Sequence, residues 1–249
     1  MNPYAGCTHR CAYCYASFMC RFTGHQESWG QFLDVKVNFP AMLEKQLSGR
    51  SRREGRLIVG TVTDAYQPAE AHYGITRSCL EILSHHPALE VHILTKSALV
   101  VRDLAILRQL RACEVGFTVT TLEQKTAQLI EPGASLPRQR LVAARQLMQA
   151  GIPVWVFIAP LLPGLSDTEE SLVNLLSTLN DMGIKEILLD SLNPYPAVVQ
   201  RLRNIYRQYF SSALPYLEDY LRHPDVYQDI VIDRLQQINE QTGCQAHFI

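Results

Sequence analysis

The chain has 249 residues and a formal net charge of −1, with 47% hydrophobic and 19% charged residues. This composition is typical of a globular protein with a buried core, and the near-zero charge excludes a general electrostatic affinity for nucleic acid or anionic lipid. Because no apolar run reaches the roughly 18 residues of a membrane span and no signal-peptide pattern opens the chain, we expect a cytoplasmic location and no membrane partner.

Short apolar, β-branched runs alternate with segments of helical periodicity. After a short first strand at residues 1–5, we expect strands at 56–62, 89–95, 113–120, 152–160 and 186–192. The intervening segments with helical spacing are 38–49, 74–86, 98–112, 136–151 and 167–183. This alternation predicts βαβ units with parallel strands, and most of the strands are apolar enough to be buried on both faces. We therefore predict an α/β protein with a partial TIM-type (β/α)6 barrel.

The pattern changes after residue 193. Residues 198–210 and 225–243 read as two further helices, and prolines punctuate the connection between them. We expect these C-terminal helices to pack on the barrel. The chain would then be a single domain over residues 1–249, with the core barrel at about 1–193 and a helical extension at 194–249.

Three of the seven cysteines, Cys7, Cys11 and Cys14, lie within eight residues. Such clustering is unlike the paired framework of a small secreted domain, and a reducing compartment would keep the thiolates available. Their spacing allows three interpretations: one apolar helix face, a structural zinc site with His9 or a distant histidine as fourth ligand, or an iron–sulfur cluster whose fourth iron has no protein ligand. An open iron would be a site for chemistry.

A C-x3-C-x2-C motif with an aromatic residue before its last cysteine resembles the radical S-adenosylmethionine (SAM) superfamily. Further stretches resemble its spore photoproduct lyase-like, or DNA repair photolyase-related, branch: "TVTDAYQPAE" (61–70), "HILTKS" (92–97), residues 129–154 and "IAPLLPGLSD" (158–167). The resemblance implies that Cys7, Cys11 and Cys14 bind a 4Fe-4S cluster and that SAM chelates its fourth iron. It also implies reductive cleavage of SAM to methionine and a 5'-deoxyadenosyl radical, which abstracts hydrogen from an unidentified substrate. A flavodoxin- or ferredoxin-type protein would donate the electron.

Polar residues follow the second and third predicted strands, where the chemistry of parallel βα folds gathers. The resemblance implies that Thr63, Asp64 and Tyr66 contact the amino group of SAM; the alternative is a helix cap beside a buried tyrosine. Lys96 and Ser97 end the third strand, where the lysine would bind the SAM carboxylate or a substrate anion, or be solvated.

The resemblance assigns further cofactor contacts after the later strands. Thr120 would contact the ribose, Pro160 and Leu161 would pack against the adenine, and the Tyr13 backbone would lie near the adenine. Threonines are also ordinary strand residues.

Glu131 and Arg140 flank a proline-containing turn. They would contact SAM, or form a salt bridge that orders the cofactor site or serves structure alone.

Two residues near the cysteines are candidates for catalysis. Tyr15 would point into the active site, and Cys20 would serve as a hydrogen donor or redox thiol, although a cysteine there can also be plain packing. Spore photoproduct lyases carry a hydrogen-donating cysteine immediately before the Thr-Asp pair, whereas this chain has Val62. Since a valine cannot donate a hydrogen atom as a thiol does, the sequence argues against thymine-dimer repair.

Two alternatives to a small-molecule or peptide enzyme remain. The basic run at 49–56 and the arginine- and tyrosine-containing stretch at 201–210 would suit nucleic acid, which predicts a nucleic-acid-modifying or repair radical SAM enzyme; a solvated loop and an amphipathic helix explain them equally well. The other alternative is a non-catalytic zinc or iron–sulfur binding protein. Cys79 and Cys113 lie in apolar stretches, where we expect packing.

Overall fold

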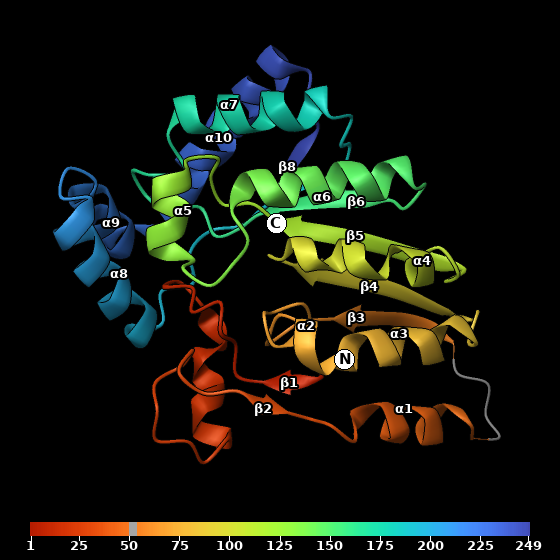
Figure 1. Ribbon diagram of the computed structural model, residues 1–249. Helices are drawn as coiled ribbons and strands as arrows, with labels where there is room; N and C mark the ends of the chain where they lie inside the picture. Colours follow the sequence, from red (N-terminus) through yellow and green to blue (C-terminus); the bar gives the residue numbers. More distant parts are fainter. Residues whose placement is uncertain (50–53) are drawn as a thin grey trace. The chain divides into compact units, whose positions relative to one another are not determined.

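Figure 1 shows the computed structural model of the chain, which describes residues 1–49 and 54–249. The chain divides into two compact units. The first comprises residues 1–10, 16–117 and 133–154, and the second comprises residues 11–15, 118–132 and 155–249. The clustered cysteines therefore contribute to both units. A single domain over residues 1–249 stays a prediction.

Strands β3 (Gly55–Val59), β4 (Leu89–Thr95) and β5 (Ala112–Thr118) belong to the first unit and pair in parallel. In β4 the side chains of Val91, Ile93 and Thr95 are buried and their neighbours are not, so this strand alternates instead of being buried on both faces. The helices of this unit are α1 (Phe39–Leu47), α2 (Glu70–Tyr73), α3 (Ile75–Ser84), α4 (Leu104–Leu107), α6 (Pro137–Gln149) and the 3₁₀ helices Tyr15–Phe22 and Ala98–Asp103.

A buried carboxylate, that of Glu70 in α2, caps the first turn of α3. Its side chain accepts hydrogen bonds from the backbone N–H groups of Thr76 (2.9 Å) and Arg77 (3.1 Å), which satisfies donors that the first turn of a helix leaves without intrahelical partners. The Arg102 guanidinium donates to the same carboxylate at 2.8 Å, and the Tyr4 hydroxyl donates to it as well. Glu70 thus fixes the connection between α2 and α3 without leaving an unpaired buried charge.

The second unit contains the parallel strands β6 (Val154–Ile158), β7 (Ile187–Leu189) and β8 (Ala246–Phe248). Its helices are α5 (Gln124–Ile130), α7 (Glu169–Asp181), α8 (Pro196–Tyr209), α9 (Leu214–Arg222) and α10 (Pro224–Thr242). Within the described residues, β3 to β8 make up a six-stranded sheet, so the predicted α/β class with parallel strands is confirmed. None of the helices in the described part of the chain has the length and apolar character needed to cross a membrane.

The sixth strand of the sheet is not the one we expected. Strand β1 (Tyr4–Ala5) pairs antiparallel with β2 (Asp34–Val35) in a small separate sheet, and β8 takes the sixth place. Met1 nevertheless lies alongside β3 in a parallel arrangement. Its ammonium group donates to the Ile58 carbonyl and its own carbonyl accepts from Gly60 N–H, which are the two hydrogen bonds of a parallel bridge.

The C-terminal region contains one helix more than the sequence predicted. Prolines stand in the first turns of α8, α9 and α10, where the absent N–H costs no intrahelical hydrogen bond. Pro196, Pro215 and Pro224, which we interpreted as marking the connecting segments, therefore lie in the first turns of helices. Helix α9 was missed for this reason, since Pro215 lies just inside its start.

Candidate functional site

The cysteine loop, residues Gly6–Cys14, is an irregular segment with two tight turns. Arg10 N–H donates to the Cys7 carbonyl at 3.3 Å, and Cys14 N–H donates to the Cys11 carbonyl at 3.1 Å. Because residues 7–14 are not helical, the three cysteines do not share a helix face. Cys7 and Cys11 are buried thiols, with 8% and 7% of their surface exposed, and Cys14 is half-buried.

The first part of the loop, in the first unit, is held by side chains that follow β3. The Thr63 hydroxyl donates to the Gly6 carbonyl at 2.6 Å. The side-chain oxygen of Gln67 accepts from Thr8 N–H (2.9 Å) and the Thr8 hydroxyl (3.2 Å), and its NH2 group donates to Thr63 Oγ1 at 3.1 Å. Gln67 is fully buried and was missed from the sequence, although it lies four residues after Thr63 in a stretch that we had singled out.

Asp64 joins the ends of β3 and β4. Its Oδ1 accepts from Tyr66 N–H (2.9 Å) and the Thr95 hydroxyl (2.7 Å), and its Oδ2 accepts from Lys96 N–H (2.8 Å). His9 Nδ1 lies 3.4 Å from the same Oδ2. Since a carboxylate has about four lone-pair positions, these three hydrogen bonds occupy most of its acceptor capacity within the first unit.

Burial alone would raise the pKa of Asp64. Attraction to His9 and the hydrogen bonds from the Lys96 amide and the Thr95 hydroxyl outweigh that effect and hold the pKa well below its usual range. The carboxylate is therefore ionised at neutral pH.

His9 bears on the zinc interpretation, because it was the local candidate for a fourth ligand. Its side chain is buried and its Nδ1 faces Asp64. Throughout residues 1–49 and 54–249, no three His, Cys, Asp or Glu side chains gather as the ligands of a single ion would. An iron–sulfur cubane does not require such convergence, since each thiolate binds a different iron.

Residues 133–140 connect the cysteine loop to the end of β4. Gly133 N–H donates to the His9 carbonyl at 3.0 Å, and Ser135 N–H donates to the Lys96 carbonyl at 3.1 Å. Arg140 is almost fully buried, and its Nε donates to the Ser135 carbonyl at 2.7 Å. Ser135 therefore links the backbone of Lys96 to the side chain of Arg140. Next to Lys96, the buried Ser97 caps the 3₁₀ helix Ala98–Asp103 by accepting from Leu99 N–H.

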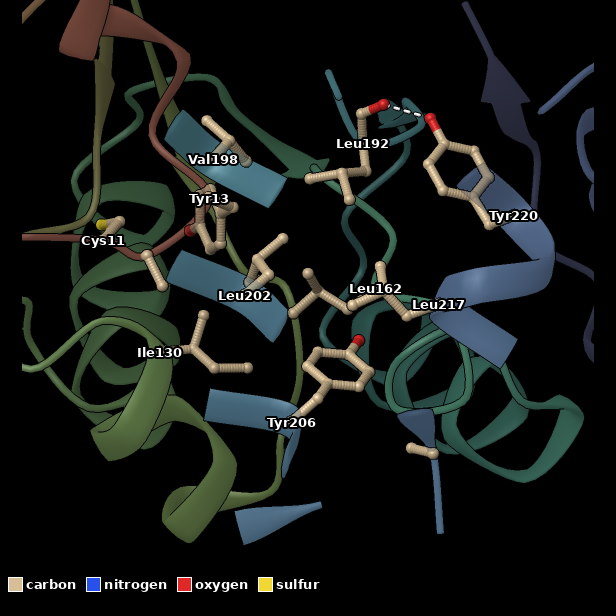
Figure 2. Packing of buried hydrophobic residues seen from close by; sticks show 12 residues of the cluster. Cys11, Tyr13, Ile130, Leu162, Leu192, Val198, Leu202, Tyr206, Leu217 and Tyr220 are labelled. Atoms are coloured by element: carbon tan, nitrogen blue, oxygen red, sulfur yellow. Dashed lines mark hydrogen bonds between the residues drawn. The ribbon is translucent and has the colours of Figure 1, made fainter. Parts of the chain in front are cut away.

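The second part of the loop, in the second unit, is held by α5, the residue after it and α8. Ala12 N–H donates to the Ile130 carbonyl at 2.8 Å. The Tyr13 hydroxyl donates to Glu131, whose Oε1 also accepts from Thr120 Oγ1 at 3.2 Å. Figure 2 shows Cys11 and Tyr13 in the same buried cluster as Ile130 and the α8 side chains Val198 and Leu202.

Helix α8 also contributes a cation that the sequence analysis did not assign to the site. The Arg201 guanidinium donates from Nε to the Ala12 carbonyl at 2.9 Å and from Nη2 to the Cys14 carbonyl at 3.1 Å. Arg203 on the same helix forms a paired contact with Glu218, at 2.7 and 2.6 Å. These two arginines of the 201–210 stretch thus bind protein groups. The other basic run, at 49–56, falls partly outside the described residues.

Four further candidates lie in different surroundings. Tyr15 is 45% exposed, and Cys20 is half-buried in the 3₁₀ helix Tyr15–Phe22. After β6, Leu161 is fully buried and Pro160 is half-buried. Their roles toward a cofactor or substrate stay predictions.

Tyr66 is buried in the interior of the first unit. Burial, and then the nearby Asp103 carboxylate, raise the pKa of its hydroxyl well above the usual value. Its contact with SAM also stays a prediction.

Comparison with known proteins identifies the family. The radical SAM superfamily matches residues 1–176. An uncharacterized protein of Methanocaldococcus jannaschii is 34% identical over 169 residues, which cover 68% of this chain and 62% of that protein. An uncharacterized protein of Mycobacterium tuberculosis is 27% identical over 255 residues, covering 94% of this chain and 72% of the relative. The chain therefore belongs to the radical SAM superfamily.

Solved structures agree on the fold. Spore photoproduct lyase complexed with dinucleoside spore photoproduct has a TM-score of 0.68 at 18% identity, over 98% of this chain and 74% of that one. Streptococcus suis SuiB bound to S-adenosylmethionine has a TM-score of 0.58 at 13% identity, over 100% of this chain and 48% of that one. The predicted superfamily resemblance is confirmed, and the likeness to spore photoproduct lyase is one of fold.

Gly133 lies close against the backbone of the cysteine loop, and its substitution tests this contact. A Cβ at this position would lie 2.2 Å from the Thr8 carbonyl oxygen and 2.8 Å from His9 Cα, and neither backbone atom can swing away. We expect Gly133→Ala to lower the free energy of unfolding by about 2 kcal/mol in a urea titration. Gly49→Ala is the control, since its Cβ would meet nothing closer than 3.6 Å. Equal stability of the two variants would contradict the packing described here.

Asp64→Asn tests the buried carboxylate. Removal of its charge should cost about 3 kcal/mol of unfolding free energy in the same titration. Because the pKa of Asp64 is lower when folded than when unfolded, its contribution is complete above the unfolded-state pKa of about 3.9 and declines as the pH falls toward the folded-state value. The gap between parent and variant should therefore narrow in acid.

The exposed pair of His25 and Asp34, 2.9 Å apart, provides the control for that experiment. Asp34→Asn breaks a similar contact in water, where the solvent screens it, so the loss should be far smaller. A loss for Asp64→Asn no greater than for Asp34→Asn would contradict the assignment of Asp64 as an anchor.

Proposed function

We propose that the protein is a radical SAM enzyme that reductively cleaves SAM at a 4Fe-4S cluster and uses the resulting 5'-deoxyadenosyl radical to abstract hydrogen from an unidentified substrate. Cys7, Cys11 and Cys14 would hold the cluster. The observation that carries the proposal is the cysteine loop, in which three thiols lie on a non-helical segment. Its backbone is hydrogen-bonded before Arg10 by the buried side chains of Thr63 and Gln67 and after Arg10 by the half-buried Arg201.

The donor set fits the cluster. Thiolates are the ligands that iron–sulfur clusters prefer, and three of them leave one iron open for a further ligand. Burial of Cys7 and Cys11 limits the access of water to the thiolates. When bound, the cluster supplies the electron that breaks the bond between the sulfonium sulfur and the 5' carbon of SAM.

Asp64 has a positioning role in this proposal. Its lone pairs already accept from the Tyr66 and Lys96 amides and the Thr95 hydroxyl. The carboxylate therefore orients the ends of β3 and β4, and its negative charge lies within the first unit near the place where the amino group of SAM is expected. Lys96 is half-buried, and its ammonium group suits the SAM carboxylate or a substrate anion.

Other residues would complete the cofactor site. Glu131 keeps the Tyr13 ring in place and also binds the Thr120 hydroxyl, so a shift of this carboxylate would move two proposed contacts at once. The remaining proposed cofactor contacts are Thr63, Tyr66, Ser97, Arg140, Pro160 and Leu161. Tyr15 and Cys20 are the proposed catalytic side chains, and a flavodoxin- or ferredoxin-type protein is the proposed electron donor.

The substrate class is open in this proposal. Spore photoproduct lyase binds a dinucleoside photoproduct and SuiB binds a precursor peptide, so the shared fold does not select between nucleic acid and peptide. Val62 stands where a donor thiol would be required for the lyase reaction. A nucleic-acid substrate would require strongly salt-dependent binding, which separates it from a small-molecule or peptide substrate.

The test is anaerobic reconstitution with iron and sulfide, followed by SAM and dithionite and chromatography for 5'-deoxyadenosine. We expect the parent to form deoxyadenosine and Cys11→Ala to form none, because the loss of one thiolate removes a cluster ligand. Cys113→Ala is the matched control: Cys113 lies in β5, where burial raises the pKa of its thiol to about 12, and this variant should match the parent.

Zinc in place of iron in the reconstituted parent would contradict the proposal. So would a bound cluster that never cleaves SAM under these conditions. Either result would favour the non-catalytic metal-binding alternative.

A further inference from the structure

Arg201 on α8 binds the backbone of the cysteine loop within the second unit. Its Nε and Nη2 donate to the carbonyl oxygens of Ala12 and Cys14, two residues apart, so one rigid planar group spans the turn that carries the last cysteine. We propose that Arg201 is a positioning residue of the cluster, which fixes the Ala12–Cys14 turn and raises the reduction potential of the cluster. This inference rests on the proposed function.

The helix that carries Arg201 is itself firmly packed. Val198, Leu202 and Tyr206 are fully buried on one face of α8, and Tyr206 donates to the Pro163 carbonyl at 3.0 Å. Leu202 directly follows Arg201 and lies in the cluster with Cys11 and Tyr13 shown in Figure 2. The backbone from which the Arg201 side chain extends is therefore fixed within the unit that holds the second half of the loop.

The positive charge of Arg201 is the reason that its contact with the loop would affect the reduction potential of the cluster. A guanidinium stays protonated in proteins. Its Nη2 is hydrogen-bonded to the carbonyl of Cys14, and only three carbon atoms separate that oxygen from the cysteine sulfur. Reduction adds a negative charge to the cluster, which a nearby cation stabilises, and cluster potentials respond to net charge and hydrogen bonding around the sulfurs.

The neighbouring arginines show that this arrangement is specific to position 201. Arg203 is paired with the Glu218 carboxylate through two hydrogen bonds, which balance its charge. Arg207 is exposed on the same helix. Arg207→Gln therefore removes one positive charge from α8 without touching the contacts that Arg201 makes with the loop.

The experiment compares Arg201→Gln, Arg201→Lys and Arg207→Gln after reconstitution. The midpoint potential is measured by a redox titration followed by electron paramagnetic resonance, and the rate of iron loss to a chelator is measured separately. We expect Arg201→Gln to shift the midpoint to a more negative potential and to lose iron several-fold faster. Arg201→Lys keeps the positive charge but not the planar group that donates to two carbonyls at once. Its midpoint potential should therefore stay near that of the parent, while its iron loss should still be faster. Arg207→Gln should match the parent in both.

Arg201→Gln with the potential and the iron-loss rate of the parent would overturn the inference. If Arg201→Gln takes up no cluster, the outcome depends on Arg201→Lys. A cluster in Arg201→Lys at the potential of the parent supports the inference. If neither Arg201→Lys nor Arg207→Gln takes up a cluster, the inference is contradicted, because cluster binding would then depend on an intact α8 and not on the charge of Arg201. Failure of the parent itself to hold a 4Fe-4S cluster would instead defeat the proposed function.

Discussion

The buried Asp64 carboxylate is the constraint on which the first unit's part of the site depends. An ionised carboxylate inside a protein is costly unless its lone pairs are occupied, and here two backbone amides and a hydroxyl satisfy it while an imidazole faces it. Those partners come from the ends of two neighbouring strands and from the cysteine loop. The buried charge therefore joins the ends of β3 and β4, and His9 of the cysteine loop lies against it.

The cysteine loop is irregular, and irregular backbone needs partners outside itself. In the first unit these partners are the side chains of Thr63 and Gln67 and the backbone of Gly133. In the second unit they are the Ile130 carbonyl and the Arg201 guanidinium. Each half of the loop therefore has partners within its own unit without a metal, which reduces the ordering that cluster binding would require.

The sequence could predict features that leave a local pattern. Strands β3 to β7 were found because short apolar, β-branched runs alternate with segments of helical periodicity, and the cysteine loop was found from its spacing. Strand β8 was missed because three residues, one of them histidine, carry no periodic signal. Gln67 and Arg201 were missed for another reason. They bind carbonyl and amide groups, which every residue carries, so nothing in the loop sequence identifies its anchors. Asp64 was found by its place after a strand, but whether it binds a ligand or the protein depends on which donors surround it.

The proposed function requires that the loop hold a cluster with one iron open to SAM. The most direct measurement is the electron paramagnetic resonance spectrum of the reconstituted, dithionite-reduced protein with and without SAM. Binding of the amino and carboxylate groups of SAM would change the electronic environment of an open iron, so we predict a 4Fe-4S spectrum that changes shape when SAM is added. A reduced-cluster spectrum that saturating SAM leaves unaltered would contradict it.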